Sequence, residues 1–250
     1  MMEVRMILQQ SATDGRYVIG IAEDASVIRD LQTMRYQIFA LEMGADIASN
    51  DQLDRDPFDD HCQHLYVWDQ ANDQYVACTR LLNRESAKAA GGFYSQGEFL
   101  LDEVLALEGE VLEIGRTCVH QDYRDGGGIA LLWQGLAKLI KDSGAQYLFG
   151  CASVPYRGDG THISTLMQRL QSYYLPEELK VRATDPVTLV SPPENVDAAI
   201  PPLLKAYLRL GAKVGSEACL DEQFGVADVF VLLNTSQLNA RYARHFRAAL

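Results

Sequence analysis

The sequence predicts a mixed α/β fold, and three adjacent segments carry the prediction. Residues 111–119 interleave β-forming side chains with charged ones, which is typical of a strand. Gly126, Gly127 and Gly128 then predict a turn, and residues 129–140 place apolar side chains at helical spacing. The short apolar run at 147–152 has the composition of a buried parallel strand. Strand, glycine turn, amphipathic helix and strand therefore follow one another in mid-chain.

The first 110 residues are predicted to form strands and helices joined by polar segments. Apolar residues at Leu31, Met34 and Ile38 mark a helix, and the Asn72-Asp73 pair between two strand segments favours a hairpin turn. The predicted elements are a strand at 15–22, a helix at 24–43, an acidic loop at 46–61, paired strands at 65–68 and 75–82, and a polar connection at 83–110 with a short helix near 102–107.

After the central block, residues 156–200 form a predicted insertion, because they are longer than a simple connection. It contains a helical piece at 163–174 and a proline-punctuated stretch. Long segments of this kind are often lids or substrate walls, and a surface excursion without a binding role is the alternative. A helix from Pro201, whose ring suits a first helical turn, and strands at 212–219 and 226–233 complete the chain.

Length and composition favour one enzyme-sized domain over residues 1–250. With 250 residues, 48% hydrophobic and 22% charged, such a chain is able to bury roughly 70–75% of its unfolded surface. No run of about 18 apolar residues and no signal-peptide pattern occurs, so we expect a cytoplasmic protein. Five cysteines without CxxC spacing argue against a disulfide framework or a zinc site. The net charge of −12 argues against nucleic acid as a partner.

The glycine cluster has two readings. Glycines let backbone amides turn toward an anion, and the start of the following helix favours phosphate. A tight strand-to-helix connection is the alternative, because the segment matches neither GxGxxG nor the P-loop.

The central block resembles the GCN5-related N-acetyltransferase (GNAT) superfamily. There, the motif Arg/Gln-x-x-Gly-x-Gly/Ala joins the fourth strand to the third helix and binds the pantetheine-linked donor. The matching positions here are Arg124, Gly127 and Ile129, so that isoleucine replaces the last small residue. Residues 206–212 are similar to the helix and turn before the superfamily's final hairpin, with Tyr207 where the family often places its general acid.

Further segments resemble a narrower branch, the acyl carrier protein-dependent N-acyltransferases of ornithine lipid biosynthesis. These enzymes are related to acyl-homoserine lactone and N-acyl amino acid synthases. The likeness runs from about Met34 to Phe246 in one order. The matching segments are 34–39, 42–45, 58–65, 79–82, 93–95, 113–119, 131–133 and 150–153.

The resemblance implies a GNAT-like fold, with a central mixed twisted sheet flanked by helices. It implies transfer of a fatty acyl group, by preference 3-hydroxyacyl, from acyl carrier protein to the α-amine of L-ornithine, giving a lyso-ornithine lipid. Acyl-phosphopantetheine is then a co-substrate, and no resident cofactor is expected. Ile129 favours a carrier-bound donor, which presents one phosphate diester instead of a pyrophosphate. The alternatives are an N-acyl amino acid or acyl-homoserine lactone signal synthase, and a non-catalytic acyl-carrier or lipid-binding module.

Acyl transfer to an amine needs an unprotonated amine, a positioned carbonyl, a stabilised oxyanion and a proton for the leaving thiolate. Glu113 is the candidate proton acceptor or ammonium ligand, with a structural salt bridge to Arg116 or another strand cation as the alternative. Tyr207 is the candidate proton donor, with core packing as the alternative. Arg35 and Arg80 are candidates for an amino-acid carboxylate, which a guanidinium binds through two hydrogen bonds.

The remaining candidates come from the acidic loop and the matching segments. Asp59 and Asp60 are candidates for a basic side chain such as that of ornithine, although an acidic loop is usually solvated. Arg116 and Ser153 complete the acceptor-site candidates. The donor-binding candidates are Cys118, Val119, His120, Arg124, Gly126, Gly127 and Gly128. No metal is expected, because the histidines lack ligand spacing.

Docking of an acidic carrier protein would need a local basic patch on this acidic chain. The candidate basic residues are Lys138, Lys141, Arg241, Arg244, His245 and Arg247. The last four share a predicted helix, so peripheral contact with anionic lipid at the inner membrane face is a further expectation. A solvated charged face is the alternative.

Overall fold

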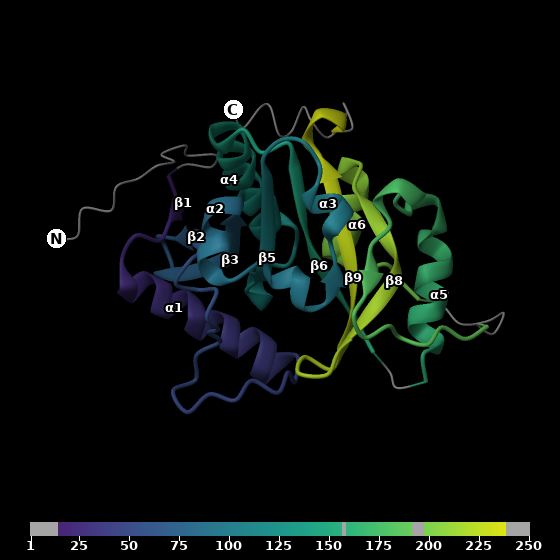
Figure 1. Ribbon diagram of the computed structural model, residues 1–250. Helices are drawn as coiled ribbons and strands as arrows, with labels where there is room; N and C mark the ends of the chain where they lie inside the picture. Colours follow the sequence, from purple (N-terminus) through teal and green to yellow (C-terminus); the bar gives the residue numbers. More distant parts are fainter. Residues whose placement is uncertain (1–14, 157–158, 192–197, 239–250) are drawn as a thin grey trace. The chain divides into compact units, whose positions relative to one another are not determined.

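The computed structural model describes residues 15–156, 159–191 and 198–238 of the chain (Figure 1). Its backbone divides into two compact units. The first holds residues 15–82 and 114–144, and the second holds residues 83–113 with the described part of 145–244. The boundary passes through one strand, β5 (Val111–Val119), whose residues up to Glu113 belong to the second unit.

Antiparallel strands form the sheet of the first unit. They are β1 (Tyr17–Ile21), β2 (Gln63–Asp69) and β3 (Gln74–Asn83), and β3 is followed in the sheet by β5. β2 and β3 form the hairpin predicted around Asn72-Asp73. Asp73 has φ 49°, a conformation that aspartate tolerates in tight turns.

Helices cover both faces of these strands. Consecutive strand residues point to opposite faces, so Tyr66 packs with Leu31 and Met34 of α1 (Ala25–Tyr36), whereas Leu65 lies against α4 (Gly127–Ser143). α1 continues as a π-helical turn, η1 (Gln37–Glu42). The predicted helix at 24–43 is therefore confirmed, with a change of helix type near its end.

Two glycines allow α4 to approach the strands closely. A Cβ on Gly135 would lie 2.7 Å from Ile19 Cγ2, and a Cβ on Gly128 would lie 2.9 Å from Val119 Cγ1 and 3.1 Å from Val76 Cγ1. Real Cβ atoms do not come this near, so a larger residue at either position would push the helix outward. Close packing thus explains Gly128 without any ligand.

The second unit contains parallel and antiparallel strand pairs. β9 (Val226–Asn234) lies between β6 (Tyr147–Pro155) and β8 (Lys213–Asp221) and is antiparallel to both (Figure 1). β5 and β6 pair in parallel, from Val111 opposite Tyr147 to Glu113 opposite Phe149. The predicted mixed α/β class is confirmed, and the strands at 147–152, 212–219 and 226–233 are all present.

A row of aromatic rings fixes the segment that precedes β4 (Phe99–Leu100). Ring centroids are 5.0 Å apart for Phe93 and Phe149, 5.9 Å for Phe149 and Phe230, and 5.7 Å for Phe230 and Phe99. Tilted and edge-on contacts at these distances are favourable beyond the area they bury. They hold the turn η2 (Tyr94–Gly97) against β6 and β9.

The predicted insertion at 156–200 contains α5 (Thr161–Leu170), the turns η4 (Gln171–Tyr173) and η5 (Glu177–Leu179), and β7 (Arg182–Ala183), which pairs with β4. The amide of Val187 donates to Ala218 O, and the amide of Leu220 donates to Asp185 O. Backbone hydrogen bonds therefore attach this segment to β8. The choice between a lid and a surface excursion stays a prediction.

Other boundaries differ modestly from expectation. α4 begins inside the glycine cluster instead of after it, and α6 (Pro202–Leu210) begins one residue after the predicted Pro201. In the polar connection at 83–110 the short helix α3 (Asp102–Leu105) is confirmed. This connection also contains α2 (Arg84–Ala90), η2 and β4, which were not predicted. The remaining turns are η3 (Gln121–Tyr123) and η6 (Thr235–Gln237).

Within the described ranges, no helix combines the length and the apolar character needed to cross a membrane. The single domain over 1–250 stays a prediction.

Candidate functional site

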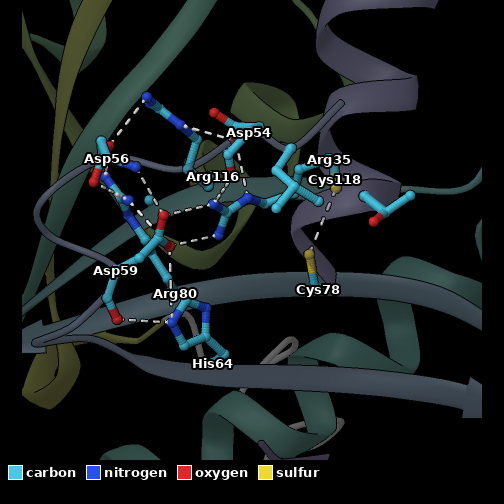
Figure 2. A network of polar contacts seen from close by, with 12 residues as sticks. Arg35, Asp54, Asp56, Asp59, His64, Cys78, Arg80, Arg116 and Cys118 are labelled. Atoms are coloured by element: carbon cyan, nitrogen blue, oxygen red, sulfur yellow. Dashed lines mark hydrogen bonds and ion pairs between the residues drawn. The ribbon is translucent and has the colours of Figure 1, made fainter. Parts of the chain in front are cut away.

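Three arginines and three aspartates of the first unit form a dense polar cluster, the arginine–aspartate cluster (Figure 2). Its members come from α1, β3, β5 and the loop at 46–61. They are Arg35, Arg80, Arg116, Asp54, Asp56 and Asp59. Equal numbers of opposite charges, in direct contact, make their burial tolerable.

Arg35 is the most enclosed member, with 1% of its side chain exposed. Its Nη1 and Nη2 donate to Oδ1 and Oδ2 of Asp59, each at 2.9 Å, and its Nε donates to Asp54 Oδ2 at 2.9 Å. Nη2 also donates to the carbonyl oxygen of Asp54. The guanidinium therefore ties the loop at 46–61 to α1.

Arg80 and Arg116 converge on the same loop from two strands. Nη1 and Nη2 of Arg80 donate to the two carboxylate oxygens of Asp56, at 2.6 and 2.7 Å. Nη2 of Arg116 lies 3.3 Å from Asp56 Oδ2, and its Nε lies 3.4 Å from Asp54 Oδ2. A two-pronged pair of this kind fixes orientation as well as charge.

The cluster shifts the titration of its buried members. Burial alone would raise the pKa of Asp59, but the hydrogen bonds and charge of Arg35, with the charge of Arg80, lower it to about 2. Burial also disfavours the Arg35 cation, yet Asp59 and Asp54 outweigh this and raise its pKa above the ordinary value. Burial lowers the pKa of His64, whose Nε2 lies 3.1 Å from Asp59 O, so this ring is neutral near pH 7.

Arg116 has an unusual backbone for a residue inside a strand. Its φ is 49°, in the left-handed region, and it follows Gly115. One such residue interrupts the alternation of side chains along β5 and turns the guanidinium toward Asp54 and Asp56. Sequence periodicity has no means of detecting this irregularity.

The structure brings together four predicted residues of the acceptor site, but with partners that differ from expectation. Arg35 and Asp59 bind each other, so neither presents its charge to solvent. The expectation of a solvated acidic loop is wrong for Asp54 and Asp59, which are 3% and 5% exposed. Asp54 and Asp56 were missed, and the only signal was an acidic loop in a chain whose predicted strands carry arginines.

The glycine loop before α4 forms a sharp turn at Gly126, which has φ 108°. The amide of Gly127 donates to Asp125 Oδ1 at 2.9 Å, and Gly128 is needed for packing. Gly126 and Gly128 are therefore required by the structure itself, the first by its backbone conformation and the second by close packing. Whether its amides bind a phosphate stays a prediction.

Arg124, the predicted donor-binding arginine, forms an ion pair with Glu42 at the end of η1. Its two terminal nitrogens donate to the two carboxylate oxygens, and its Nε donates to Val119 O at 2.9 Å. Both side chains are partly exposed, at 42% and 37%. The hydrogen bond from Arg124 lowers the pKa of Glu42, and Glu42 raises that of Arg124.

The predicted donor-binding residues Cys118, Val119 and His120 form a segment at the end of β5. Its third amide, that of His120, donates to Val76 O at 2.7 Å and is therefore engaged. The thiol of Cys118 is buried, 3.7 Å from that of Cys78, and this hydrogen bond together with burial raises its pKa. A buried, protonated thiol is inert, so the side chain of Cys118 is a packing group.

Asp69, the last residue of β2, anchors the loop that leads into α4. It is fully buried and accepts hydrogen bonds from Arg16 Nη2 at 2.5 Å, Tyr123 OH at 2.8 Å, Asn72 Nδ2 at 3.0 Å and the amide of Ala71 at 3.0 Å. These donors, the first of them Arg16, lower the pKa of Asp69. Tyr123 thereby joins the glycine loop to the β2–β3 hairpin.

Glu113 is buried in the second unit, at 4% exposure. Its Oε2 accepts from the amide of Tyr94 at 2.9 Å, and its Oε1 accepts from the amide and hydroxyl of Ser95 at 2.7 and 2.6 Å. An ionised carboxylate only accepts, so three donors suit it well. The predicted alternative named Arg116 as its partner, whereas η2 supplies these three contacts.

Further carboxylates lie near this group. The side-chain oxygens of Glu98, Asp221 and Asp228 come within 4.8 Å of one another. Burial and then the charge of Asp228 raise the pKa of Glu98 to about 8, so the group holds a proton at neutral pH. The predicted absence of a metal stays a prediction.

The last predicted residues lie on separate elements. Tyr207 is buried on α6, and its carbonyl accepts from the amides of Gly211 and Ala212 at the helix end. Ser153 is exposed on β6, opposite Asp228 of β9. Lys138 forms an ion pair with Asp142 at 3.2 Å. The predicted basic group Arg241, Arg244, His245 and Arg247 lies outside the described residues.

Known proteins resemble this chain along most of its length. Residues 34–134 match the model of the acetyltransferase (GNAT) domain. The chain is 34% identical over 246 residues to L-ornithine N(alpha)-acyltransferase of Rhizobium meliloti (strain 1021), covering 91% of this chain and 83% of that protein. For the enzyme of the same name from Rhodobacter capsulatus, the identity is 34% over 249 residues, covering 92% and 94%.

Solved structures share the fold at low sequence identity. The acyl-homoserine lactone synthase LasI superimposes with a TM-score of 0.50 at 13% identity, covering 87% of this chain and 89% of that one. FeeM, an N-acyl amino acid synthase from uncultured soil microbes, gives a TM-score of 0.50 at 11% identity, covering 89% and 92%. Together with the match to the acetyltransferase (GNAT) domain, these likenesses confirm the predicted GNAT-like fold.

Proposed function

The chain, which contains a GNAT domain, belongs to the L-ornithine N(alpha)-acyltransferase family, and we propose that it transfers a fatty acyl group to the α-amine of L-ornithine. The observation that supports this proposal is the 34% identity to curated relatives of that name over more than nine-tenths of this chain. In this proposal the donor is a 3-hydroxyacyl group on acyl carrier protein, and the product is a lyso-ornithine lipid.

Glu113 is the proposed proton acceptor or ammonium ligand for the attacking amine. Its burial and its three donors from η2 support this role, because they hold both carboxylate oxygens in fixed positions. The amine of a free amino acid is mostly protonated at neutral pH, so a nearby carboxylate first binds the ammonium group. Proton removal, directly or through water, then frees the nitrogen lone pair for attack.

The donor is proposed to bind along the end of β5 and the start of α4. Backbone amides of Cys118 and Val119 are the proposed ligands of the thioester oxygen, and His120 has a lesser role because its amide already donates to Val76. The phosphodiester is proposed to meet the amide of Gly128, where a helix begins, and Gly127 has a lesser role because its amide already donates to Asp125 Oδ1.

The acceptor's carboxylate is proposed to bind at Arg116, which is 11% exposed and the most accessible arginine of the arginine–aspartate cluster. Arg80, Arg35 and Asp59 support it by holding the loop at 46–61 in place. Ser153 is a further proposed contact of the acceptor. Tyr207 is the proposed proton donor for the leaving thiolate.

The proposed carrier-bound donor rests on one position. Ile129 stands in the first turn of α4, where the superfamily motif has a small residue. A branched side chain there reduces the space beside the loop, which hinders a nucleotide pyrophosphate more than a single phosphodiester. Equal turnover with coenzyme A and carrier-protein thioesters would contradict this part of the proposal.

A purified-protein assay tests the function. The protein is incubated with 3-hydroxyacyl thioesters of acyl carrier protein or coenzyme A and with L-ornithine, L-tyrosine or S-adenosylmethionine, and products are weighed by mass spectrometry. N-acylation of the α-amine of ornithine is expected from the carrier-bound donor. Preferred acylation of tyrosine, or a lactone from S-adenosylmethionine, would replace the proposal with a signal synthase. Thioester binding without any product would indicate a binding module.

A further inference from the structure

Glu98, Cys151, Ser95 and Glu113 form a hydrogen-bonded chain inside the second unit. The carboxyl group of Glu98 is hydrogen-bonded to Cys151. Cys151 Sγ donates to Ser95 Oγ at 3.3 Å, and Ser95 Oγ donates to Glu113 Oε1 at 2.6 Å. The four residues come from the segment before β4, from β6, from η2 and from β5. Two carboxyl groups are thus joined through one thiol and one hydroxyl.

The thiol of Cys151 has two hydrogen-bond partners, Glu98 and Ser95, but only one hydrogen. It can therefore donate to only one of them at a time. When Glu98 is protonated, its O–H donates to Cys151 Sγ, and the thiol is free to donate to Ser95. When Glu98 is ionised, the thiol turns to the carboxylate and its donation to Ser95 ends. The proton state of Glu98 therefore sets the direction of hydrogen bonds along the chain.

The surroundings of Glu98 favour its protonated form near neutral pH. Asp228 of β9, Asp221 of β8, Cys151 of β6 and Tyr94 of η2 are the groups that face it most strongly, and none of them is a cation. Burial, then the charge of Asp228, raises its pKa to about 8. Burial and the neighbouring carboxylates also raise the pKa of Cys151, so that the thiol keeps its hydrogen. Cys219 of β8 is close enough for Glu98 to affect its titration.

One oxygen of Glu98 supports the same assignment. Its Oε2 is buried and has no hydrogen-bond partner among the described residues. An oxygen without a partner is less costly on a neutral carboxyl group than on a carboxylate.

We propose that Glu98 is a positioning residue for Glu113 and that it acts through Cys151 and Ser95. When Glu98 loses its proton, the direction of hydrogen-bond donation along this chain reverses. The inference rests on the proposed role of Glu113 in binding and deprotonating the amine. Glu98 does not touch the acceptor in this proposal. It determines how strongly Ser95 donates to Glu113 and how many negative charges lie in the group.

Loss of the Glu98 proton to solvent has two effects on Glu113. Ser95 no longer receives a hydrogen bond from Cys151, so its own donation to Glu113 weakens, because hydrogen bonds in a chain polarise one another. The new buried charge also stabilises the ammonium form of the bound amine, which is the unreactive form. The first effect leaves Glu113 less firmly positioned and the second favours the unreactive ammonium form, so acyl transfer is expected to fall above the Glu98 titration.

The Glu98→Gln variant tests the switch, because the amide is neutral at every pH and still donates to the thiol. The expected readout is the ratio of wild-type to variant kcat/KM for the acceptor, which cancels ionisations that the two proteins share. We expect this ratio to fall about threefold or more between pH 6.5 and pH 9.5, with its midpoint near the Glu98 titration. The matched control is Glu110→Gln, an exposed residue of the same unit, whose ratio stays flat.

Cys151→Ala tests the path. In the Cys151→Ala background, the change with pH in the kcat/KM ratio between the proteins with and without Glu98 is expected to shrink by half or more, because the thiol link is missing. An undiminished effect would assign it to the direct action of the Glu98 charge on the bound ammonium group and overturn the proposed path. Infrared difference spectroscopy supplies a readout without turnover: a protonated-carboxyl band present at pH 7, absent from Glu98→Gln and lost near pH 8.

The outcomes separate this inference from the proposed function. A missing carboxyl band at pH 7 overturns the protonated Glu98. A band with a flat activity ratio overturns its coupling to Glu113. If no protein acylates ornithine at any pH although the band is present, the proposed function fails, and with it the claim that Glu98 serves catalysis.

Discussion

Arg35 and Asp59 are joined by two parallel hydrogen bonds of 2.9 Å, and both side chains are buried. The residues are 24 positions apart, so the pair closes the loop at 46–61 onto α1. If either residue were removed, the other would be a buried charge with neither an ionic partner nor water to solvate it.

Removing Arg35 is therefore expected to destabilise the fold. Arg35→Leu should lower the free energy of unfolding by about 3–5 kcal/mol, because Asp54 and Asp59 lose their buried partner. Urea unfolding followed by circular dichroism measures the loss. Arg55→Ala, which breaks the exposed pair with Asp51, should cost about 1 kcal/mol or less. Similar losses in the two variants would contradict the importance assigned to burial.

Asp59 should also give the protein acid sensitivity in a defined range. Its pKa is lowered from 3.8 to about 2 by Arg35, so the folded state binds this proton less readily than the unfolded state. The stabilisation is fully present above pH 3.8 and is lost as the pH falls toward 2, by roughly 2 kcal/mol in total. Asp59→Asn should lack this part of the pH dependence in urea unfolding between pH 5 and 2.5. Parallel pH curves for the two proteins would contradict the assignment.

Gly128 and Gly127 offer a matched test of the glycine loop. Gly128→Ala should destabilise by about 1–3 kcal/mol, since the new methyl group meets Val119, Val76 and the carbonyl of Tyr123. Gly127→Ala meets only Asp125 Oδ1 at 3.2 Å and should change stability by about 0.5 kcal/mol or less. Thermal unfolding distinguishes them. Equal losses would show that close packing is not what requires Gly128.

Glu113→Gln should reduce kcat/KM by about 100-fold or more if Glu113 accepts the amine's proton. The amide also places an NH2 group opposite the donors of Tyr94 and Ser95, so folding must be checked by circular dichroism and unfolding. Glu110→Gln, near the same end of β5, should leave kcat/KM unchanged. Full activity of a folded Glu113→Gln protein would remove Glu113 from the mechanism.

The ion pair between Arg124 and Glu42 predicts opposite effects of two substitutions. Arg124→Ala should raise the KM for the acyl donor several-fold, because a cation for its phosphodiester is lost. Glu42→Gln should lower that KM or leave it unchanged, since it releases the guanidinium from a competing carboxylate. Stability should change by about 1 kcal/mol or less in both variants, as for partly exposed pairs. A raised KM in Glu42→Gln would indicate that the pair itself binds the donor.

Much of the fold could be predicted because the local pattern of apolar residues along the chain indicates which side chains are buried. The strands at 15–22 and 226–233 are short runs rich in β-forming apolar residues, the helix at 129–140 has apolar residues at helical spacing, and each was found. η2 and β4 were missed because their residues are fixed by distant rings, Phe149 and Phe230 among them. Contacts of this kind leave no local pattern.

The candidate site divides in the same way. Arginines matching a family motif could be named from sequence, but their partners could not, since Asp54 and Asp56 carry no periodic signal. The left-handed backbone at Arg116 depends on the register of neighbouring strands, which a single sequence does not encode locally. Ser95 was noted only as part of a matching segment, although it supplies two of the three donors to Glu113.

Asp69 determines when the conformational entropy of the glycine loop is lost. Tyr123, next to that loop, is bound to a carboxylate that also holds Arg16 and Asn72. The loop is thus ordered when the protein folds, before any donor arrives. A ligand that meets a loop already in place loses less affinity to ordering, because no part of its binding free energy is spent on fixing the loop.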